Sequence, residues 1–412
     1  MVSPAAEVER VARTSYGRLV AFLSRQSRDV AAAEDALADA FRIALERWGE
    51  TGVPVSPEAW LMTTARRRLI DSGRRRETAQ AALSLLPLLS VGDHLGGEVD
   101  RLPDWRLELM FACAHPAIDP AVHAPLMLQV VLGFDAAAIA AAFLVAPATM
   151  GQRLSRAKAK IKAAGIAFEI PESGRLAERL AGVLDAIYVA FGAAQDDIAG
   201  ADLRMRWLGE EALSLARVVD GLLPDQPEVK GLLALMLHGT ARRKARFHPE
   251  IGYVPLDAQD VALWDAGMIA EAERLLLAAS RFGVPGRFQL EAAIQSAHAC
   301  RRLGSVVPDD AMILLYDGLV ALAPSVGALV GRLACLLAMD DLDRAGQALA
   351  AIDESLAADY QPYWAARAAF HDRLGQVEQA DRAYDRALCL ATDPAVRAFL
   401  GERRRAMLGR RV

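Results

Sequence analysis

The sequence predicts an all-α protein. Apolar residues recur at spacings of three and four almost throughout, alanine, leucine and arginine dominate, and the alternation typical of β-strands is scarce. Hydrophobic residues make up 53% and charged residues 24% of the chain, a balance typical of globular proteins. Because 412 residues exceed one core of ordinary size, we expect two or three domains.

Several function classes are not supported by the sequence. The first residues carry charge from Glu7 onward and lack the apolar core of a signal peptide, and no run of about 18 apolar residues predicts a membrane span. We therefore expect a cytoplasmic protein with no membrane partner. The four cysteines form no CxxC pair, and Cys113 with His115 lacks a second ligand pair, so we predict no metal, no cofactor and a packed thiol at Cys113.

The first expected helix runs from about Glu7 to Gln26 and ends at a polar break, Ser27 to Asp29. A second amphipathic helix follows over 30–48. One stripe of this helix is apolar and is expected to pack, namely Leu37, Phe41, Ala44, Leu45 and Trp48. Acidic residues lie off the stripe, namely Glu34, Asp35, Asp39 and Glu46.

A third helix, 59–76, is strongly basic. Ser56 and Pro57 are typical of a helix start, and Leu61, Ala65 and Leu69 form its apolar line. Six arginines are expected to project elsewhere, with Asp71 as the single carboxylate: Arg66, Arg67, Arg68, Arg74, Arg75 and Arg76. This clustering in a chain of net charge -5 favours a polyanion as partner, although a merely solvated face is the alternative.

Periodicity is lost over 77–101, which we interpret as a linker. Helices resume near Trp105, and Asp135 is expected to cap a short alanine-rich helix that a tight turn joins to a second helix beginning at Pro147. This layout is that of a helix-turn-helix, whose second helix enters the major groove. Its polar residues suit bases and phosphates, namely Thr149, Gln152, Arg153, Arg156, Lys158, Lys160 and Lys162.

The order of these segments resembles a bacterial RNA polymerase sigma factor of the extracytoplasmic-function (group IV) class. SRDVAAAEDALADAFRIALERW and SPEAWLMTTARRRLIDSGRRR are similar to region 2, and LGFDAAAIAAAFLVAPATMGQRLSRAKAKI is similar to region 4. The expected domains are region 2 over 1–76, the linker, region 4 over 102–174 and a helical-repeat extension over 175–412.

The resemblance implies roles for particular residues. Asp35, Asp39 and Phe41 would meet the clamp coiled coil of core RNA polymerase, although a core position is the favoured reading for Phe41. Trp60 would lie near unpaired promoter bases or be buried at the helix start. The arginines would hold phosphates, but the family commonly has asparagine where this chain has Arg67, so a base-specific role is not carried over there. Region 4 would meet the flap.

The last 240 or so residues read as helices joined by short turns. One unit matches the small and aromatic positions of a tetratricopeptide (TPR) repeat: Trp364, Ala368, Gly375, Ala380, Tyr384 and Ala387. Weaker units lie around Ala345 and Ala212. We interpret 238–262, flanked by His238 and His248, as an ordered surface loop packed by Phe247 and Tyr253; a metal or catalytic role there is the lesser alternative.

Together these features predict a transcription initiation factor that binds core RNA polymerase and promoter DNA, and that is not an enzyme. The repeats are expected to be regulatory and to offer a groove to a protein or peptide. A further hypothesis has the acidic repeat domain fold back on the basic N-terminal part. The alternative function is a helical-repeat scaffold or adaptor with a nucleic-acid-binding N-terminal half.

Overall fold

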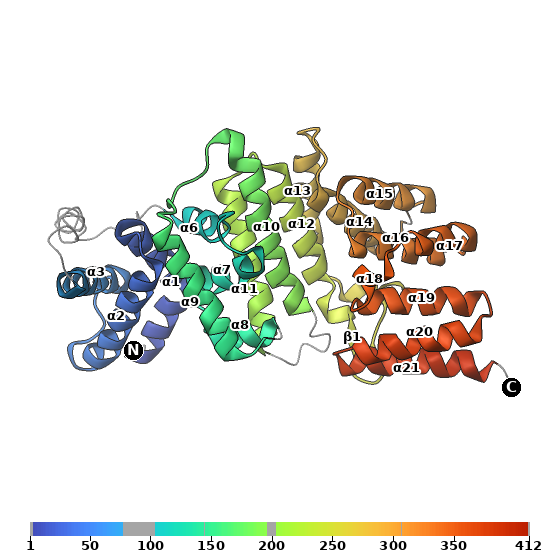
Figure 1. The fold of residues 1–412 in the computed structure, drawn as a ribbon, viewed down its shortest axis with the longest axis horizontal. Helices are drawn as coiled ribbons and strands as arrows, with labels where there is room; N and C mark the ends of the chain where they lie inside the picture. The colour runs from blue at the N-terminus through green and yellow to red at the C-terminus, as the bar shows by residue number, and fades with distance from the viewer. Residues whose placement is uncertain (1–2, 77–103, 144, 196–202, 306, 411–412) are drawn as a thin grey trace. The chain divides into compact units, whose positions relative to one another are not determined.

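The computed structural model describes residues 3–76, 104–143, 145–195, 203–305 and 307–410. Their regular secondary structure is almost entirely helical, which confirms the all-α class (Figure 1). The chain forms two compact units, Met1–Ala193 and Ala194–Val412, and each is described here by itself. The expected linker at 77–101 lies outside the described residues.

The first unit contains eight labelled helices within its described part. They are α1 (Pro4–Ser27), α2 (Val30–Thr51), α3 (Pro57–Arg76), α6 (Arg106–Cys113), α7 (Pro120–Leu132), α8 (Ala136–Ala142), α9 (Pro147–Ala163) and α10 (Ser173–Gln195). The last of these crosses the boundary between the units. A domain starting at residue 175 therefore begins inside α10, whereas the compact division falls near the end of that helix.

Helix α1 is the centre of the first unit, because it packs against α2, α3, α6 and α7. Leu19, Val20 and Leu23 of α1 are almost completely buried. Gly17 permits a close approach of α7, since a Cβ at that position would lie 2.0 Å from the backbone oxygen of Val131. Segments more than 100 residues apart therefore share one core.

Local chemistry sets the helix starts in this unit. The side chain of Asp29 accepts a hydrogen bond from the amide of Ala32 at the start of α2, and Asp135 accepts one from Ala138 at the start of α8. Arg28 between α1 and α2 has a φ of 54°. The break predicted at Ser27 to Asp29 and the cap predicted at Asp135 are both confirmed.

The second unit begins with three long helices and ends in stacked pairs. Its α-helices are α11 (Leu203–Leu222), α12 (Pro227–Ala241), α13 (Ala266–Ser280), α14 (Arg287–Ala299), α15 (Asp309–Leu322), α16 (Val326–Ala338), α17 (Leu342–Ala350), α18 (Glu354–Ala357), α19 (Gln361–Arg373), α20 (Val377–Leu390) and α21 (Pro394–Gly409). Short 3-10 turns are η3 (Arg243–Ala245), η4 (Leu256–Ala258), η5 (Val261–Leu263) and η6 (Cys300–Leu303). Strands β1 (Phe247–His248) and β2 (Gly252–Tyr253) form one antiparallel hairpin.

The stacked helices at the C-terminal end bury the positions that the repeat pattern picked out. Helices α19, α20 and α21 pack in succession (Figure 1). Ala368, Ala380 and Ala387 are fully buried, Tyr384 is 4% exposed, and Gly375 turns the chain with a φ of 67°. This burial agrees with the expected pattern, while the assignment as a TPR-like repeat stays a prediction.

The segment 238–262, expected to be an ordered surface loop, contains short elements of secondary structure. His238 lies inside α12 and is only 1% exposed, so it does not flank a loop. Phe247 pairs with Tyr253 in the hairpin, and the Tyr253 ring lies 5.4 Å from that of Phe399. Hydrophobic periodicity could not reveal this hairpin, because its strands have two residues each.

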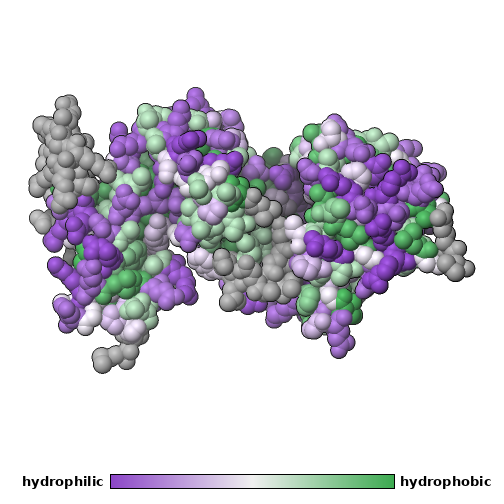
Figure 2. Space-filling view, turned by 60° about the horizontal axis from the view of Figure 1, so that its bottom comes forward, coloured by the Kyte–Doolittle hydropathy of each residue, from purple (hydrophilic) through white to green (hydrophobic). Residues whose placement is uncertain are grey.

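The surface is mixed in character. Hydrophilic and hydrophobic side chains are interspersed on the face shown in Figure 2, and no broad apolar belt is visible there. Among the helices of the described ranges, none is both long and apolar enough to cross a membrane.

Candidate nucleic-acid and polymerase interface

Helix α9 carries a basic face that is open to solvent. Met150, Leu154, Ala157 and Ile161 are buried, as the spacing predicted. Several of the predicted DNA-binding residues are exposed on the helix, namely Thr149, Gln152, Arg153, Arg156 and Lys160. Within the described part of the chain, the three cations among them form no ion pair. This face is therefore available to an anionic partner.

Lys158 and Lys162 are used differently. The Nζ of Lys158 lies 2.7 Å from Oε2 of Glu34, and each side chain is 13% exposed. The Nζ of Lys162 lies 2.7 Å from Oδ2 of Asp29, the residue that caps α2. Both lysines were expected to project freely from the second helix of a helix-turn-helix, but α9 docks on α2 through them. Sequence spacing could not show this, because the partners lie more than 100 residues away.

Glu34 lies in a buried polar environment at this contact. The hydroxyl of Tyr16 donates a hydrogen bond of 3.4 Å to the same carboxyl. Burial raises the pKa of Glu34, although Lys158 and Tyr16 oppose the shift. The carboxyl also contributes to the raised pKas of Tyr16 and of the buried thiol of Cys113, for which burial is the larger cause. The packed thiol predicted at Cys113 is confirmed.

One face of α2 stays open beyond the contact with α9. Asp35 is exposed, and the side chain of Asp39 is 47% exposed beside Arg42. Phe41 is only half-buried, so it belongs neither fully to the core nor fully to the surface. Leu45 is 53% exposed, and the prediction that it packs in the core is wrong. Phe41 and Leu45 form a small apolar surface. They recur at helical spacing from Glu34, so this surface lies on the same side of α2 as the contact with α9.

Leu45 is the residue that sequence reasoning missed as a candidate for binding. Its neighbours at the same end of the helix, Ala44 and Trp48, are fully buried. The apolar stripe of α2 is therefore wider than the part of the helix that is buried. Helical periodicity alone could not show which side of the stripe faces solvent.

The first arginine of α3 is not on the surface. Arg66 is 6% exposed, its guanidinium lies 4.6 Å from the Phe22 ring centroid, and its Nε and Nη2 lack protein partners in the described residues. Phe22 stacks on Trp105 at 4.9 Å, and Arg25 lies 4.8 Å from the Trp105 ring. Burial lowers the pKa of Arg66. Its side chain thus joins α3 to α1 in this structure instead of pointing outward as expected.

The other predicted residues of α3 occupy distinct environments. Arg67 is exposed and Trp60 is half-buried, with its ring 5.5 Å from that of Trp48 in an edge-on contact. Arg74, Arg75 and Arg76 lie in the last turns of the helix, but their side chains are outside the described part. The structure thus brings none of these cations to α9 through a described contact.

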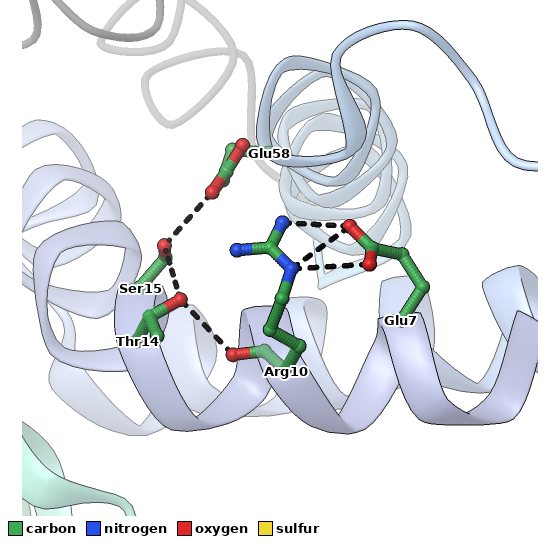
Figure 3. A network of polar contacts seen from close by, with 5 residues as sticks. All are labelled: Glu7, Arg10, Thr14, Ser15 and Glu58. Carbon is green, nitrogen blue, oxygen red and sulfur yellow. Dashed lines mark hydrogen bonds and ion pairs between the residues drawn. The ribbon is translucent and has the colours of Figure 1, made fainter. Parts of the chain in front are cut away.

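A polar network fixes the start of α3 against α1 (Figure 3). Ser15 donates a hydrogen bond of 3.1 Å to Glu58 and contacts Thr14 at 3.3 Å. Arg10 makes paired contacts with Glu7, and this carboxylate raises the pKa of Arg10, with a smaller contribution from Glu58. The hydrogen bond between Ser15 and Glu58 thus joins the start of the arginine-rich α3 to α1.

Metal ligation has no support in the described ranges. No group of three or more histidine, cysteine or acidic side chains there is arranged to hold an ion. His115 instead accepts a hydrogen bond of 3.1 Å from the amide of Ala117 through Nδ1.

The model of Sigma-70 region 2 matches residues 11–78, which include most of α1 and all of α2 and α3. The model described as a family of unknown function (DUF6596) matches residues 179–280. The chain is therefore an all-α protein with a Sigma-70 region 2 domain followed by a DUF6596 domain.

One relative matches over most of both chains. The "Uncharacterized protein R00370" of Rhizobium meliloti (strain 1021) is 36% identical over 385 residues, covering 92% of this chain and 90% of that protein. The chain belongs to the same family as that protein. No solved structure matches.

Proposed function

We propose that the protein is a sigma factor that binds core RNA polymerase and directs it to promoter DNA, without itself being an enzyme. The observation that carries this proposal is the match of Sigma-70 region 2 to the α1–α3 bundle. Assignment to the extracytoplasmic-function class rests on the additional resemblance of 105–165 to region 4. In this role the protein is soluble and lies in the cytoplasm.

The polymerase contact is assigned to the open face of α2. Asp35 and Asp39 supply negative charge to meet the basic clamp coiled coil, and charge complementarity of this kind guides association. Phe41 and Leu45 add an apolar surface that loses contact with water on binding. The proposed flap contact belongs to the region around α8 and α9.

The DNA contact is assigned to two helices. In α9 the free residues are Thr149 and Gln152 near the N-terminal end, which suit base edges, and Arg153, Arg156 and Lys160, which suit phosphates. In α3, Arg67 and the last three arginines are assigned to phosphates and Trp60 to an unstacked base. Arg66 and Lys158 are left out of this set, because each is engaged within the protein.

Core binding provides the first test. Full-length protein is mixed with core RNA polymerase, and the dissociation constant of the wild type is compared with that of Leu45→Glu. We expect at least a tenfold weakening, because a buried charge replaces an apolar contact. Leu277→Glu is the matched control, since Leu277 is 59% exposed on α13 of the second unit. Absence of any complex with the wild type would favour the scaffold function instead.

The holoenzyme provides the second test. Binding to a promoter fragment is measured over a range of salt concentrations, with Arg153 and Arg156 both changed to alanine. Losing two phosphate contacts should reduce the slope of log K against log salt by roughly 2. Lys162→Ala is the control, because Lys162 is already paired with Asp29. A double variant with the wild-type slope would show that α9 does not lie on DNA.

The second unit is proposed to be a TPR-like regulatory domain that binds a protein or peptide and controls activity by folding back on the N-terminal part. A truncation that tests this role has to keep residues up to Ala193, because Arg179 of α10 donates a hydrogen bond to the backbone of Phe111. Transcription by the truncated holoenzyme should fall if the domain supplies a required contact and rise if it inhibits. Unchanged transcription would refute both roles.

A further inference from the structure

The outer face of α13 is open to solvent. Ala270, Arg274, Leu277 and Arg281 follow one another at spacings of four, three and four residues, so they lie along one side of the helix. All four are exposed, and Leu277 is 59% exposed. The opposite side of α13 packs against α12. Spacings of three and four in alternation are those of positions that face a second helix in a coiled coil.

Two cations frame the leucine on this face. Arg274 lies one turn before Leu277, and Arg281 lies one turn after it. Neither arginine forms an ion pair with any residue that the structure describes. In the turn after the helix, Phe282 and Val284 are 43% and 64% exposed. Exposed apolar side chains next to free arginines are typical of a protein interface, and these two charges call for a partner with carboxylates.

The outer face of α15 has the same spacing and the opposite charge. Asp310, Leu314, Asp317 and Ala321 are separated by four, three and four residues. Leu314 is 68% exposed, and the side chain of Asp317 is 42% exposed although its Oδ1 lies 2.5 Å from Nε of Arg332. Asp310 is exposed and makes no ion pair within the described ranges. This face therefore offers two carboxylates around a leucine.

The two faces are complementary when the helices run antiparallel. The facing pairs are then Arg281 with Asp310, Leu277 with Leu314, Arg274 with Asp317, and Ala270 with Ala321. Each arginine meets a carboxylate, the leucines meet each other, and the alanine pair allows a close approach of the helices. In a parallel arrangement every charged side chain would face a leucine or an alanine. The pattern therefore selects one orientation.

Within one copy of the chain these two faces do not meet. Helix α14 packs against both α13 and α15, and Leu277 and Leu314 both remain exposed (Figure 1). A second copy carries both faces, so it supplies a complementary partner for each. Soluble homo-oligomers are mostly two-fold symmetric, and a two-fold dimer would make the contact between α13 and α15 twice.

We propose that two copies of the chain associate through antiparallel packing of α13 of one copy on α15 of the other. The interface uses the second unit alone, so it stands independently of the transcriptional role proposed above. It also lies outside the face of α2 that is assigned to polymerase.

Sedimentation equilibrium of the full-length wild type tests the association itself. The average mass should rise from that of one chain towards that of two over about 1–100 µM protein. Added salt should weaken the association, because the facing charges are near the surface. The mass of a single chain at every concentration would overturn the proposal.

A charge exchange tests which helices meet. Arg281→Asp and Asp310→Arg each place like charges opposite one another, and each variant alone should associate at least tenfold more weakly than the wild type. In an equimolar mixture of the two variants, every facing pair again has opposite charges, so association should recover. The same recovery is expected in the double variant. A mixture and a double variant that both stay as weak as the single variants would contradict this pairing.

Matched controls separate this interface from general surface effects. Lys244→Asp changes an exposed cation of η3 and should leave the association at the wild-type level. Leu277→Ser and Leu314→Ser should each weaken it at least tenfold, because an apolar contact is lost. Leu356→Ser is their control, since Leu356 is 72% exposed on α18. Equal losses in test and control variants would refute the assignment to α13 and α15.

Discussion

The ion pair between Lys158 and Glu34 joins α9 to α2, with 2.7 Å between Nζ and Oε2 and little solvent access to either side chain. It connects the helix assigned to DNA with the helix assigned to polymerase. Because the apolar surface of Phe41 and Leu45 continues on the same side of α2, a polymerase subunit that covers this surface will lie close to α9.

A double-mutant cycle measures this pair. Lys158→Met and Glu34→Gln should each lower the free energy of unfolding by about 2 kcal/mol, because a half-satisfied polar group is left buried. The double variant should lose less than the sum, with a coupling energy of about 1 kcal/mol or more in urea unfolding. Lys160→Met is the control at an exposed position of the same helix and should change stability by less than about 0.5 kcal/mol. Additive losses would show that the two groups do not interact in solution.

Arg66 and Arg67 are adjacent in sequence and should respond in opposite ways. Arg66→Met should keep most of the stability, because an apolar side chain of similar length can replace a buried cation that has no carboxylate. The salt dependence of promoter binding by the Arg66→Met variant should equal that of the wild type. Arg67→Ala should leave the unfolding free energy unchanged and reduce the salt slope by about 1. The reverse pattern would mean that Arg66 leaves the core when DNA binds.

His298 should make stability depend on pH. Its pKa is lowered from 6.5 to about 4 in the folded protein, so the unfolded state binds its proton more tightly. Stability from this group is present above about pH 6.5 and is lost as the pH falls towards about 4, by up to about 3 kcal/mol. His298→Gln should flatten the unfolding free energy in this window, measured by urea titration in chloride buffers. An equally steep profile in the variant would assign the loss to other groups.

Two glycines in the first unit provide a matched test of packing. Gly17→Ala should destabilise the protein by about 1–3 kcal/mol, because the new Cβ would collide with the backbone oxygen of Val131. Gly49→Ala, near the end of α2, should be neutral or stabilise by up to about 1 kcal/mol, since its Cβ would meet no side chain and no backbone of another element within 4 Å. Thermal unfolding of both variants gives the comparison. Equal effects would show that α1 and α7 are not in contact in solution.

The sequence predicted what depends on neighbours along the chain. Caps such as Asp135 and the buried line of α9 follow from local hydrogen bonding and helical period, and both are found. Partners distant in sequence were not predictable, because nothing near Lys158 indicates Glu34. The burial of Arg66 was missed for a related reason: a long side chain next to an apolar line can turn inward when an aromatic ring of another helix offers a surface.

The position of α1 has a consequence for synthesis of the protein on the ribosome. The ribosome makes this helix before α7, yet α7 supplies part of its packing surface, and Gly17 meets Val131 only after that later segment has emerged. Non-local contacts of this kind slow folding and leave apolar surface open in the meantime. Helices α1, α2 and the arginine-rich α3 therefore lack part of their core until α7 has been made, and a chaperone can meet their apolar surface in that interval.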